Sequence, residues 1–288
     1  MSNADAPVTS RPGGMYTGAT PAPANYAARA RRWGWWYFAE HYARQLYRYA
    51  LPLALNDILM PLAYILAIGV GLGSLIDANA GTVQGLRYLD FVAPALIIGV
   101  ISQSAVTEVT YPVLSGFKWR RIYYAPAAGP LSGAQISIGH LLAASFRTLW
   151  QATIAIVQLA ICGVHLTWGV LALLLIAPLG ALALAAGVQA YAATVTNEGS
   201  TFTLLFRFLI LPLTLFSGTY YALDSMPIWL QWIGWISPLW HASELTRWAA
   251  VGMSLSPGMI AVHVLFLLLC AGVGVAVSCR NYERRLRQ

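Results

Sequence analysis

Four ionisable residues, Asp57, Glu108, Arg147 and Arg207, lie within stretches of sequence that are otherwise apolar. A charged side chain at membrane depth is unfavourable, so it persists where it pairs with another charge, lines a polar pathway or reaches the interface. All four lie nearer the predicted cytoplasmic ends of their helices than the midplane. Snorkelling to the interface is therefore the alternative to a function, above all for the two long arginine side chains.

Glu108 is the deepest of the four and ends a polar run made of Ser102, Gln103, Ser104 and Thr107. Such side chains either hydrogen-bond between neighbouring helices or line a translocation path. Hydrogen bonding between helices is the simpler of the two interpretations. We predict that Ser102, Gln103, Glu108 and Arg207 form either a pathway or a helix interface.

Residues that could catalyse a reaction or hold a metal are scattered. The sequence has no Gly-x-x-x-x-Gly-Lys-Ser/Thr loop, no His-Glu-x-x-His and no Gly-x-Ser-x-Gly. The histidines lie on separate segments without ligand-like neighbours, and the 3 cysteines form no Cys-x-x-Cys pair. We expect no catalytic residue, metal or cofactor in this chain. Structural or interfacial roles are expected for His41, His140, His165, His241 and His263.

The composition predicts a membrane protein that crosses the bilayer several times. Of 288 residues, 9% are charged and 58% are apolar, which excludes an ordinary soluble domain. A spanning helix needs roughly 20 apolar residues, so six spans need only about 120. The net charge of +7 is explained by basic residues on the cytoplasmic face of a membrane, without nucleic acid.

The apolar pattern predicts an all-α membrane protein with six transmembrane helices within residues 51–279. Residues 148–197 contain no Asp, Glu, Lys or Arg. This stretch is too long for one crossing, so we place a break at residues 163–169. The predicted spans are residues 51–75, 91–114, a third from 139, then 170–193, 202–220 and 257–279.

Three further segments flank or interrupt these spans. Residues 1–32 are rich in Pro, Gly, Ala, Ser and Thr and predict a disordered cytoplasmic tail. Residues 33–50 predict an amphipathic interfacial helix rich in Trp and Tyr, whose alternative is a soluble-core helix. Residues 280–288 predict a basic cytoplasmic tail.

The segment 221–256 is apolar and aromatic but is broken by Pro and Gly residues. We predict two short helices, at 228–236 and 239–251, that enter the outer leaflet as a re-entrant pair covered by protein. A seventh span is the alternative.

The positions of the basic residues predict the topology. With both termini cytoplasmic, the outer segments hold only Arg87 and Arg247, and Arg147 and Arg207 fall within spans. This asymmetry is typical of inside loops. The inside segments hold the other basic residues: Arg11, Arg29, Arg31, Arg32, Arg44, Arg48, Lys118, Arg120, Arg121, Arg280, Arg284, Arg285 and Arg287.

Two stretches resemble the permease subunits of type-2 ATP-binding-cassette (ABC-2) exporters, especially the group related to nodulation-factor and polyketide-drug export permeases. The first is residues 88–142, with YLDFVAPALI followed by TEVTYPVLSGFKWRRIYYAPAAGPLSGAQISIGHLL. The second, and more specific, is LFSGTYYALDSMPIWLQWIGWISPLWHASELTRW at residues 215–248. Together they cover about a third of the chain, and the long N-terminal tail departs from the family pattern and leaves room for an additional contact.

The resemblance implies two permease protomers, the second most simply an identical copy, paired with two copies of a separate ATPase that binds ATP and Mg. It implies that the loop at residues 115–130 couples to this ATPase through Lys118, Arg120 and Arg121, with Asn197 and Glu198 as further contacts. Lipid headgroup contact is the alternative for the three basic residues. An outer gate or packing of the re-entrant pair would involve Pro238, His241, Glu244 and Arg247.

The sequence therefore predicts a non-enzymatic, multi-pass permease of a bacterial cytoplasmic membrane that exports a drug, lipid or glycolipid. Membrane lipid is an expected partner and nucleic acid is not. An ATP-independent transporter or channel is the alternative, and it would move substrate when expressed alone. An intramembrane enzyme would need clustered acids or a His/Asp site, which the sequence lacks.

Overall fold

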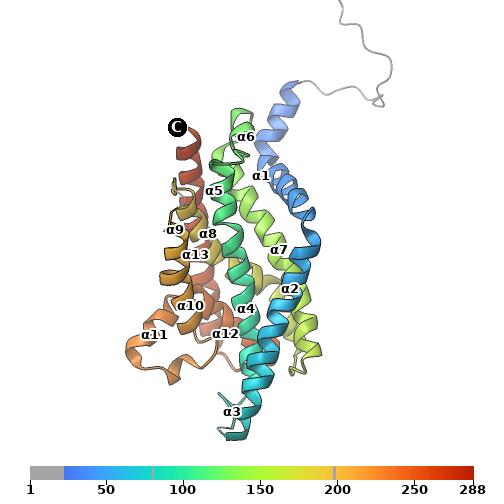
Figure 1. The fold of residues 1–288 in the computed structure, drawn as a ribbon, viewed down its shortest axis with the longest axis vertical. Coiled ribbons are helices and arrows are strands. Elements are labelled where there is room, and N and C mark those ends of the chain that lie inside the picture. Colours follow the sequence, from blue (N-terminus) through green and yellow to red (C-terminus); the bar gives the residue numbers. More distant parts are fainter. Residues whose placement is uncertain (1–22, 80, 197–198) are drawn as a thin grey trace, which may run out of the picture.

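Helices form most of the chain that the computed structural model describes, which is residues 23–79, 81–196 and 199–288 (Figure 1). No strand occurs in these ranges. The helices are α1 (Pro23–Tyr47), α2 (Ala50–Tyr64), η1 (Ile65–Leu72), α3 (Gly73–Asn79), α4 (Tyr88–Glu108), α5 (Tyr111–Phe117), α6 (Tyr124–Ala128), α7 (Gly133–Ile161), η2 (Trp168–Ala172), α8 (Leu173–Ala192), α9 (Thr201–Leu205), η3 (Phe206–Ile210), α10 (Leu211–Phe216), η4 (Leu223–Ser225), α11 (Ile228–Trp235), α12 (Pro238–Val251) and α13 (Pro257–Leu286).

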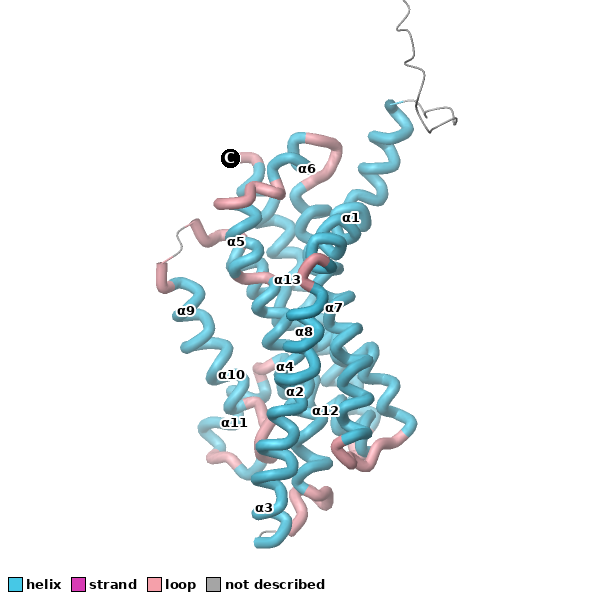
Figure 2. The backbone as a smooth tube through the Cα atoms, turned by 45° about the vertical axis from the view of Figure 1, so that its right-hand side comes forward, coloured by secondary structure: helices cyan, strands magenta, loops and turns pink. Residues whose placement is uncertain are grey.

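Long apolar helices run side by side along the molecule (Figures 1 and 2). Within the described ranges, four are long and apolar enough to cross a membrane: Ala50–Asn79, Tyr88–Phe117, Trp168–Ala192 and Pro257–Leu286. The helix α7 and the shorter apolar stretch Thr201–Phe216 run lengthwise beside them. The predicted all-α membrane class is confirmed, whereas the count of six spans stays a prediction.

The helix α8 lies at the centre and packs against α4, α7, α12 and α13. Small residues permit this close approach, as is common between membrane helices. A Cβ atom added to Gly274 on α13 would lie 2.8 Å from Cβ of Ala186 on α8. Gln189 on α8 adds polar contacts, because its Nε2 donates to Oγ of Ser137 on α7 at 3.0 Å and to Oγ of Ser278 on α13 at 3.1 Å.

Local sequence signals fix where several helices begin and end. Ser132 and Gln135 form a reciprocal capping box at the start of α7. Pro238 begins α12, and Gly252 ends it in the left-handed conformation at φ +74°, where a glycine avoids the steric penalty of a Cβ atom. Ser256 caps α13 by accepting a hydrogen bond from the backbone N–H of Met259 at 3.2 Å.

Both predicted tails differ from the structure. The helix α1 begins at Pro23, ten residues before the predicted start at Trp33, and residues 1–22 lie outside the described ranges. The helix α13 continues to Leu286, so the segment 280–288 is mainly helical. Its last turns are tied to α8, because Asn281 Nδ2 donates to the Ala190 carbonyl and Arg285 Nη1 donates to the Ala193 carbonyl, both at 2.8 Å.

The helix α1 packs on protein as well as facing outward. Phe38 and Tyr42 are buried, and Gln135 Nε2 on α7 donates to the Arg31 carbonyl at 2.7 Å. The outward side carries exposed aromatic rings, including Trp33 and Trp36. The predicted apolar face is therefore partly covered by α7, and the aromatic residues beside it are those that favour a membrane interface.

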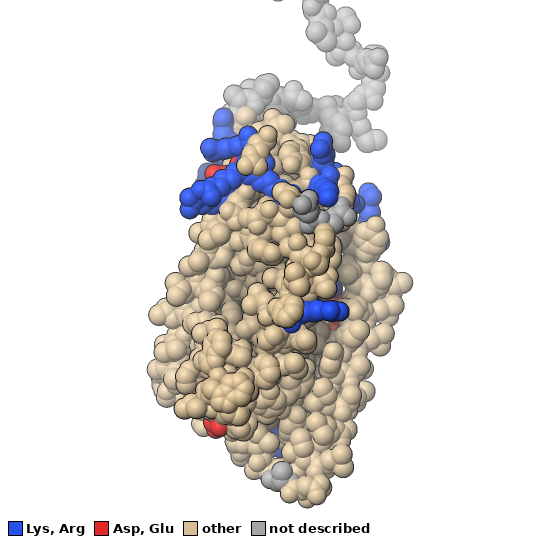
Figure 3. Space-filling model, turned by 60° about the vertical axis from the view of Figure 1, so that its left-hand side comes forward, with Lys and Arg blue, Asp and Glu red and all other residues tan. Residues whose placement is uncertain are grey.

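The two short helices predicted within residues 221–256 are present as α11 and α12. They lie toward the end of the molecule that also holds α3 (Figure 1). Lys and Arg side chains gather at the opposite end, where the C-terminus lies (Figures 1 and 3). We call the end with α6 and the C-terminus the basic end and the other the far end.

Candidate functional site

Asp57, Glu108 and Arg147 form a buried ion cluster that joins α2, α4 and α7. Nη2 of Arg147 donates to Oδ1 of Asp57 at 2.8 Å, and Nη1 of Arg147 donates to the Glu108 carboxylate. Gln151, one turn along α7, donates from Nε2 to the same Asp57 oxygen at 2.8 Å. The Arg147 side chain is only 12% exposed, so ion pairing rather than snorkelling accounts for this arginine.

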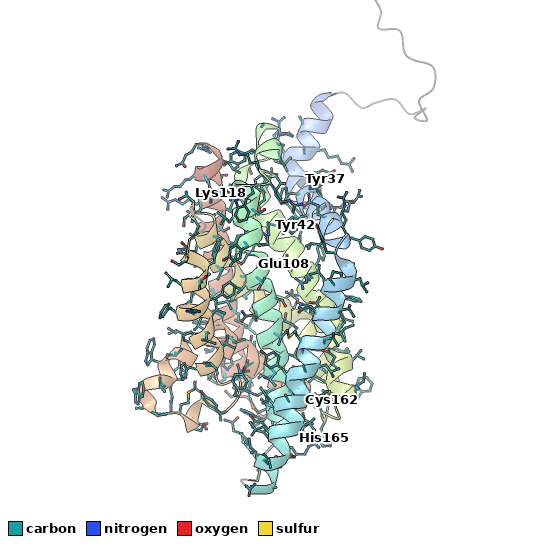
Figure 4. The ribbon with its side chains drawn as sticks, viewed as in Figure 1. Tyr37, Tyr42, Glu108, Lys118, Cys162 and His165 are labelled. Atoms are coloured by element: carbon teal, nitrogen blue, oxygen red, sulfur yellow. The ribbon has the colours of Figure 1, made fainter. Side chains whose placement is uncertain are left out.

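A cavity of about 750 Å³ lies between α2, α4 and the segment from η3 to α10. Met60 and Tyr64 come from α2, and Gln103, Thr107 and Glu108 come from α4. The ion cluster reaches this cavity through Glu108 and Arg147. Figure 4 shows Glu108 between Lys118 at the basic end and His165 at the far end, closer to Lys118.

Arg207 lines the opposite wall of the cavity, on η3. It is exposed, and it forms no hydrogen bond or ion pair with the residues that the structure describes. The helix η3 is a π-helical stretch inside Thr201–Phe216, and such stretches occur often at functional sites. Arg207 is thus a cation on an apolar helical stretch, and the described residues leave its charge unpaired.

The structure separates the four predicted pathway residues into two groups. Gln103, Glu108 and Arg207 meet at the cavity. Ser102 does not: it is 2% exposed and its Oγ has no hydrogen-bond partner among the described residues. The pairing of Asp57 with Arg147 and Gln151 was not predicted, although the spacing of Arg147 and Gln151 by one helical turn is a signal that they share a face.

A second, apolar pocket of about 440 Å³ lies beyond the cavity toward the far end. Ile68 and Leu72 line it from η1, and Ile76 lines it from α3. Tyr220 borders both the pocket and the cavity. The backbone at Tyr220 is fixed, because Tyr88 Oη donates to its carbonyl at 3.0 Å. Tyr220 is therefore shared by a charged space and an apolar one.

Arg247 on α12 is fully buried. Its Nη2 donates to the Gly218 carbonyl at 2.6 Å, and its Nε donates to the Phe91 carbonyl at 2.9 Å. Glu244, one turn away on α12, accepts from Nη1 at 2.7 Å. Arg247 thus links α12 to α4 and to the turn before Tyr220. A role of Arg247 and Glu244 in an outer gate or in packing the re-entrant pair stays a prediction.

Two histidines, His241 and His263, are joined by a hydrogen bond. His241 lies on α12, which begins at Pro238. Its Nε2 donates to the Trp235 carbonyl at 3.0 Å, so its Nδ1 accepts from Nδ1 of His263, 2.8 Å away. The sequence did not predict this contact. No group of three or more possible metal ligands occurs among the described residues.

The predicted coupling residues lie at the basic end. Lys118, Arg120 and Arg121 are exposed between α5 and α6, and Figure 4 shows Lys118 at this end. The Arg121 guanidinium lies 5.9 Å from the ring centre of Tyr124. The other two predicted coupling residues, Asn197 and Glu198, fall outside the described residues.

The long apolar helices define a polytopic helical membrane protein. The chain belongs to the ABC-2 type transporter family, whose membrane-domain model matches residues 36–251. It is 26% identical over 240 residues to nodulation protein J of Rhizobium leguminosarum bv. viciae, covering 82% of this chain and 89% of that protein. It is 24% identical over 238 residues to nodulation protein J of Sinorhizobium fredii, covering 82% and 88%.

Proposed function

We propose that this chain is the permease subunit of an ABC exporter that moves an amphipathic substrate across a bacterial cytoplasmic membrane. The observation that carries the proposal is the cavity between α2, α4 and the η3–α10 segment, which combines charged and apolar walls at membrane depth. Such a lining suits a drug, lipid or glycolipid, each of which has a polar and an apolar part. The rhizobial relatives support a bacterial membrane.

The energy for transport comes from a separate ATPase subunit, which holds ATP and Mg. ABC-2 membrane proteins are subunits that work with an ABC ATPase, and the family match supports this partnership. The docking surface is the exposed basic segment with Lys118, Arg120 and Arg121. Two ATPase copies and two permease protomers, the second a copy of this chain, make up the transporter.

The cavity faces the second protomer in this proposal, so the pathway is lined by α2, α4 and α9–α10 from each copy. Closure of the ATPase dimer pushes the two coupling segments together and shifts the permease from an inward-open to an outward-open packing. The far-end cluster around Arg247 holds α12 against α4 during this change. The alternative is an ATP-independent transporter or channel.

The test is co-expression of the full chain with its cognate ABC ATPase, followed by detergent pull-down through the permease. We expect stoichiometric ATPase with vanadate-sensitive ATP hydrolysis in the eluate. The triple variant K118E/R120E/R121E should lose the ATPase but insert into the membrane normally. The matched control R29E/R31E/R32E reverses three exposed charges on α1 and should retain it.

Two results would overturn this proposal. Absence of any ATPase from the eluate in several detergents, combined with substrate flux through the permease alone, would establish the ATP-independent alternative. Equal loss of the ATPase in both triple variants would show that total charge at the basic end, rather than the coupling segment, supports association.

A further inference from the structure

The cavity between α2, α4 and the η3–α10 segment contains one cation that pairs with none of the described residues. Arg147 pairs with Asp57 and Glu108, both of which accept hydrogen bonds from it. Arg207, on the facing wall, has no such partner among the described residues. An arginine at membrane depth is stabilised by an anion, because its charge is otherwise poorly solvated. A ligand that enters this cavity is therefore selected by Arg207.

The walls around Arg207 favour an anion on its side of the cavity. The ion cluster holds two carboxylates against one guanidinium, so its own side repels anions when both acids are ionised. Gln103 and Thr107 on α4 also line the cavity. A guanidinium matches the geometry of a phosphate, sulfate or carboxylate with paired N–H donors.

The space beyond Tyr220 suits the apolar part of the same molecule. The apolar pocket is lined by aliphatic and tyrosine side chains, among them Ile68, Leu72 and Val83. Its one serine is already satisfied, because Ser225 Oγ donates to the Ala222 carbonyl at 2.6 Å. A chain without polar atoms can enter this pocket without leaving a polar group unpaired.

Two buried groups hold the boundary between the two spaces in place. Arg247 donates to the carbonyls of Gly218 and Thr219, at 2.6 and 3.3 Å, and Tyr88 donates to the carbonyl of Tyr220. The backbone carbonyls of residues 218–220 are therefore held by hydrogen bonds. Tyr220 itself borders both spaces, so the cavity and the pocket are neighbours.

We propose that Arg207 binds the anionic head group of an amphipathic substrate and that the pocket beyond Tyr220 takes its apolar chain. This proposal rests on the exporter function and narrows its substrate to anionic amphiphiles. The head group then lies in the cavity beside Arg207 and the chain points toward the far end, where α3 borders the pocket.

The test is binding of a fluorescent dodecyl phosphate to the full chain in phosphatidylcholine nanodiscs, with empty nanodiscs subtracted and no ATPase present. R207Q should weaken binding about tenfold or more, since a hydrogen bond to a charged group is lost. R207K keeps the charge but loses the paired donors, so it should recover only part of the affinity. The control R284Q removes an exposed arginine outside both spaces and should bind like the wild type.

Competition and chain length test the two halves of the site separately. Unlabelled dodecyl phosphate should displace the probe from the wild type, whereas dodecyltrimethylammonium and dodecyl maltoside should not. The wild type should prefer hexadecyl phosphate to octyl phosphate. I68W places a large ring in the apolar pocket and should remove most of this preference. The control L66W changes an exposed position on η1 outside both spaces and should leave the preference unchanged.

The proposal is overturned if R207Q binds like the wild type, if R284Q weakens binding equally, or if the cationic competitor displaces the probe as well as the phosphate. It is also overturned if R207Q dissociates a permease dimer, because Arg207 would then pair with a second copy. Should R207Q fail to fold, competition on the wild type decides the question. Each of these results leaves ATPase association, and with it the exporter proposal, to be judged on its own.

Discussion

Arg147 on α7 donates a hydrogen bond from Nη2 to Oδ1 of Asp57 on α2, across 2.8 Å. Its other terminal nitrogen binds Glu108 on α4, so a single guanidinium connects three helices that lie around one wall of the cavity. Both acids are almost fully buried. An interaction of this kind fixes how the helices are placed, because each partner alone would be an uncompensated buried charge.

Replacing Arg147 by alanine should lower the free energy of unfolding by about 3–5 kcal/mol, because it leaves two buried carboxylates without a cation. The measurement is thermal denaturation in detergent micelles. The triple variant D57N/R147M/E108Q removes every charge at similar volume and should regain most of the loss. A change below about 1 kcal/mol in R147A, typical of exposed pairs, would contradict a buried cluster.

The positions of the helices could be predicted from the sequence because lipid imposes a simple rule on it. A crossing needs a long apolar run, and such runs coincide with Ala50–Asn79, Tyr88–Phe117 and Pro257–Leu286. Pro and Gly residues likewise delimited α11 and α12. The ends of α1 and α13 were not predictable in this way, since contacts with α7 and α8 rather than local composition extend them.

The candidate site was predictable only in part. Intramembrane charges are rare enough that Asp57, Glu108, Arg147 and Arg207 were identified as individual residues. That Arg147 pairs with Asp57 was not predictable, because the two are 90 positions apart and the rotation of each helix about its axis decides whether they meet. The role of Tyr220 had no signal at all, since a tyrosine near a membrane surface is ordinary.

Replacing Arg247 by lysine should destabilise the far end even though the charge is kept. A lysine cannot donate at once to the carbonyls of Phe91 and Gly218 and to Glu244, as the planar guanidinium does. We expect faster hydrogen exchange in α12 and in residues 217–221, measured by mass spectrometry, with α7 unchanged. R284K, at an exposed position, is the control, and equal exchange in R247K and the wild type would disprove the linking role.

Gly272 and Gly274, two positions apart on α13, should respond differently to replacement by alanine. A Cβ atom at Gly274 would lie 2.8 Å from the Ala186 side chain and from the Gly187 backbone nitrogen, whereas at Gly272 nothing lies within 4 Å. G274A should lower stability by about 1–3 kcal/mol through overpacking. G272A should be neutral or stabilise by up to about 1 kcal/mol, because alanine favours helix. Detergent melting curves of both variants test this, and equal effects would show that α8 and α13 do not approach so closely.

Single cysteines should report on which side of the membrane each end of the molecule lies. In a background without Cys162, Cys270 and Cys279, we expect N79C at the far end to react with an impermeant maleimide on intact cells. R29C and R284C, at exposed positions of the basic end, should react only in inside-out vesicles, because basic segments remain cytoplasmic. Six crossings place residues 29 and 284 on the same side, whereas the seven-span alternative places them on opposite sides. Labelling of R284C but not R29C from outside would therefore replace the six-span topology with seven, and labelling of both from outside would reverse the orientation and remove the basic end as a docking surface for a cytoplasmic ATPase.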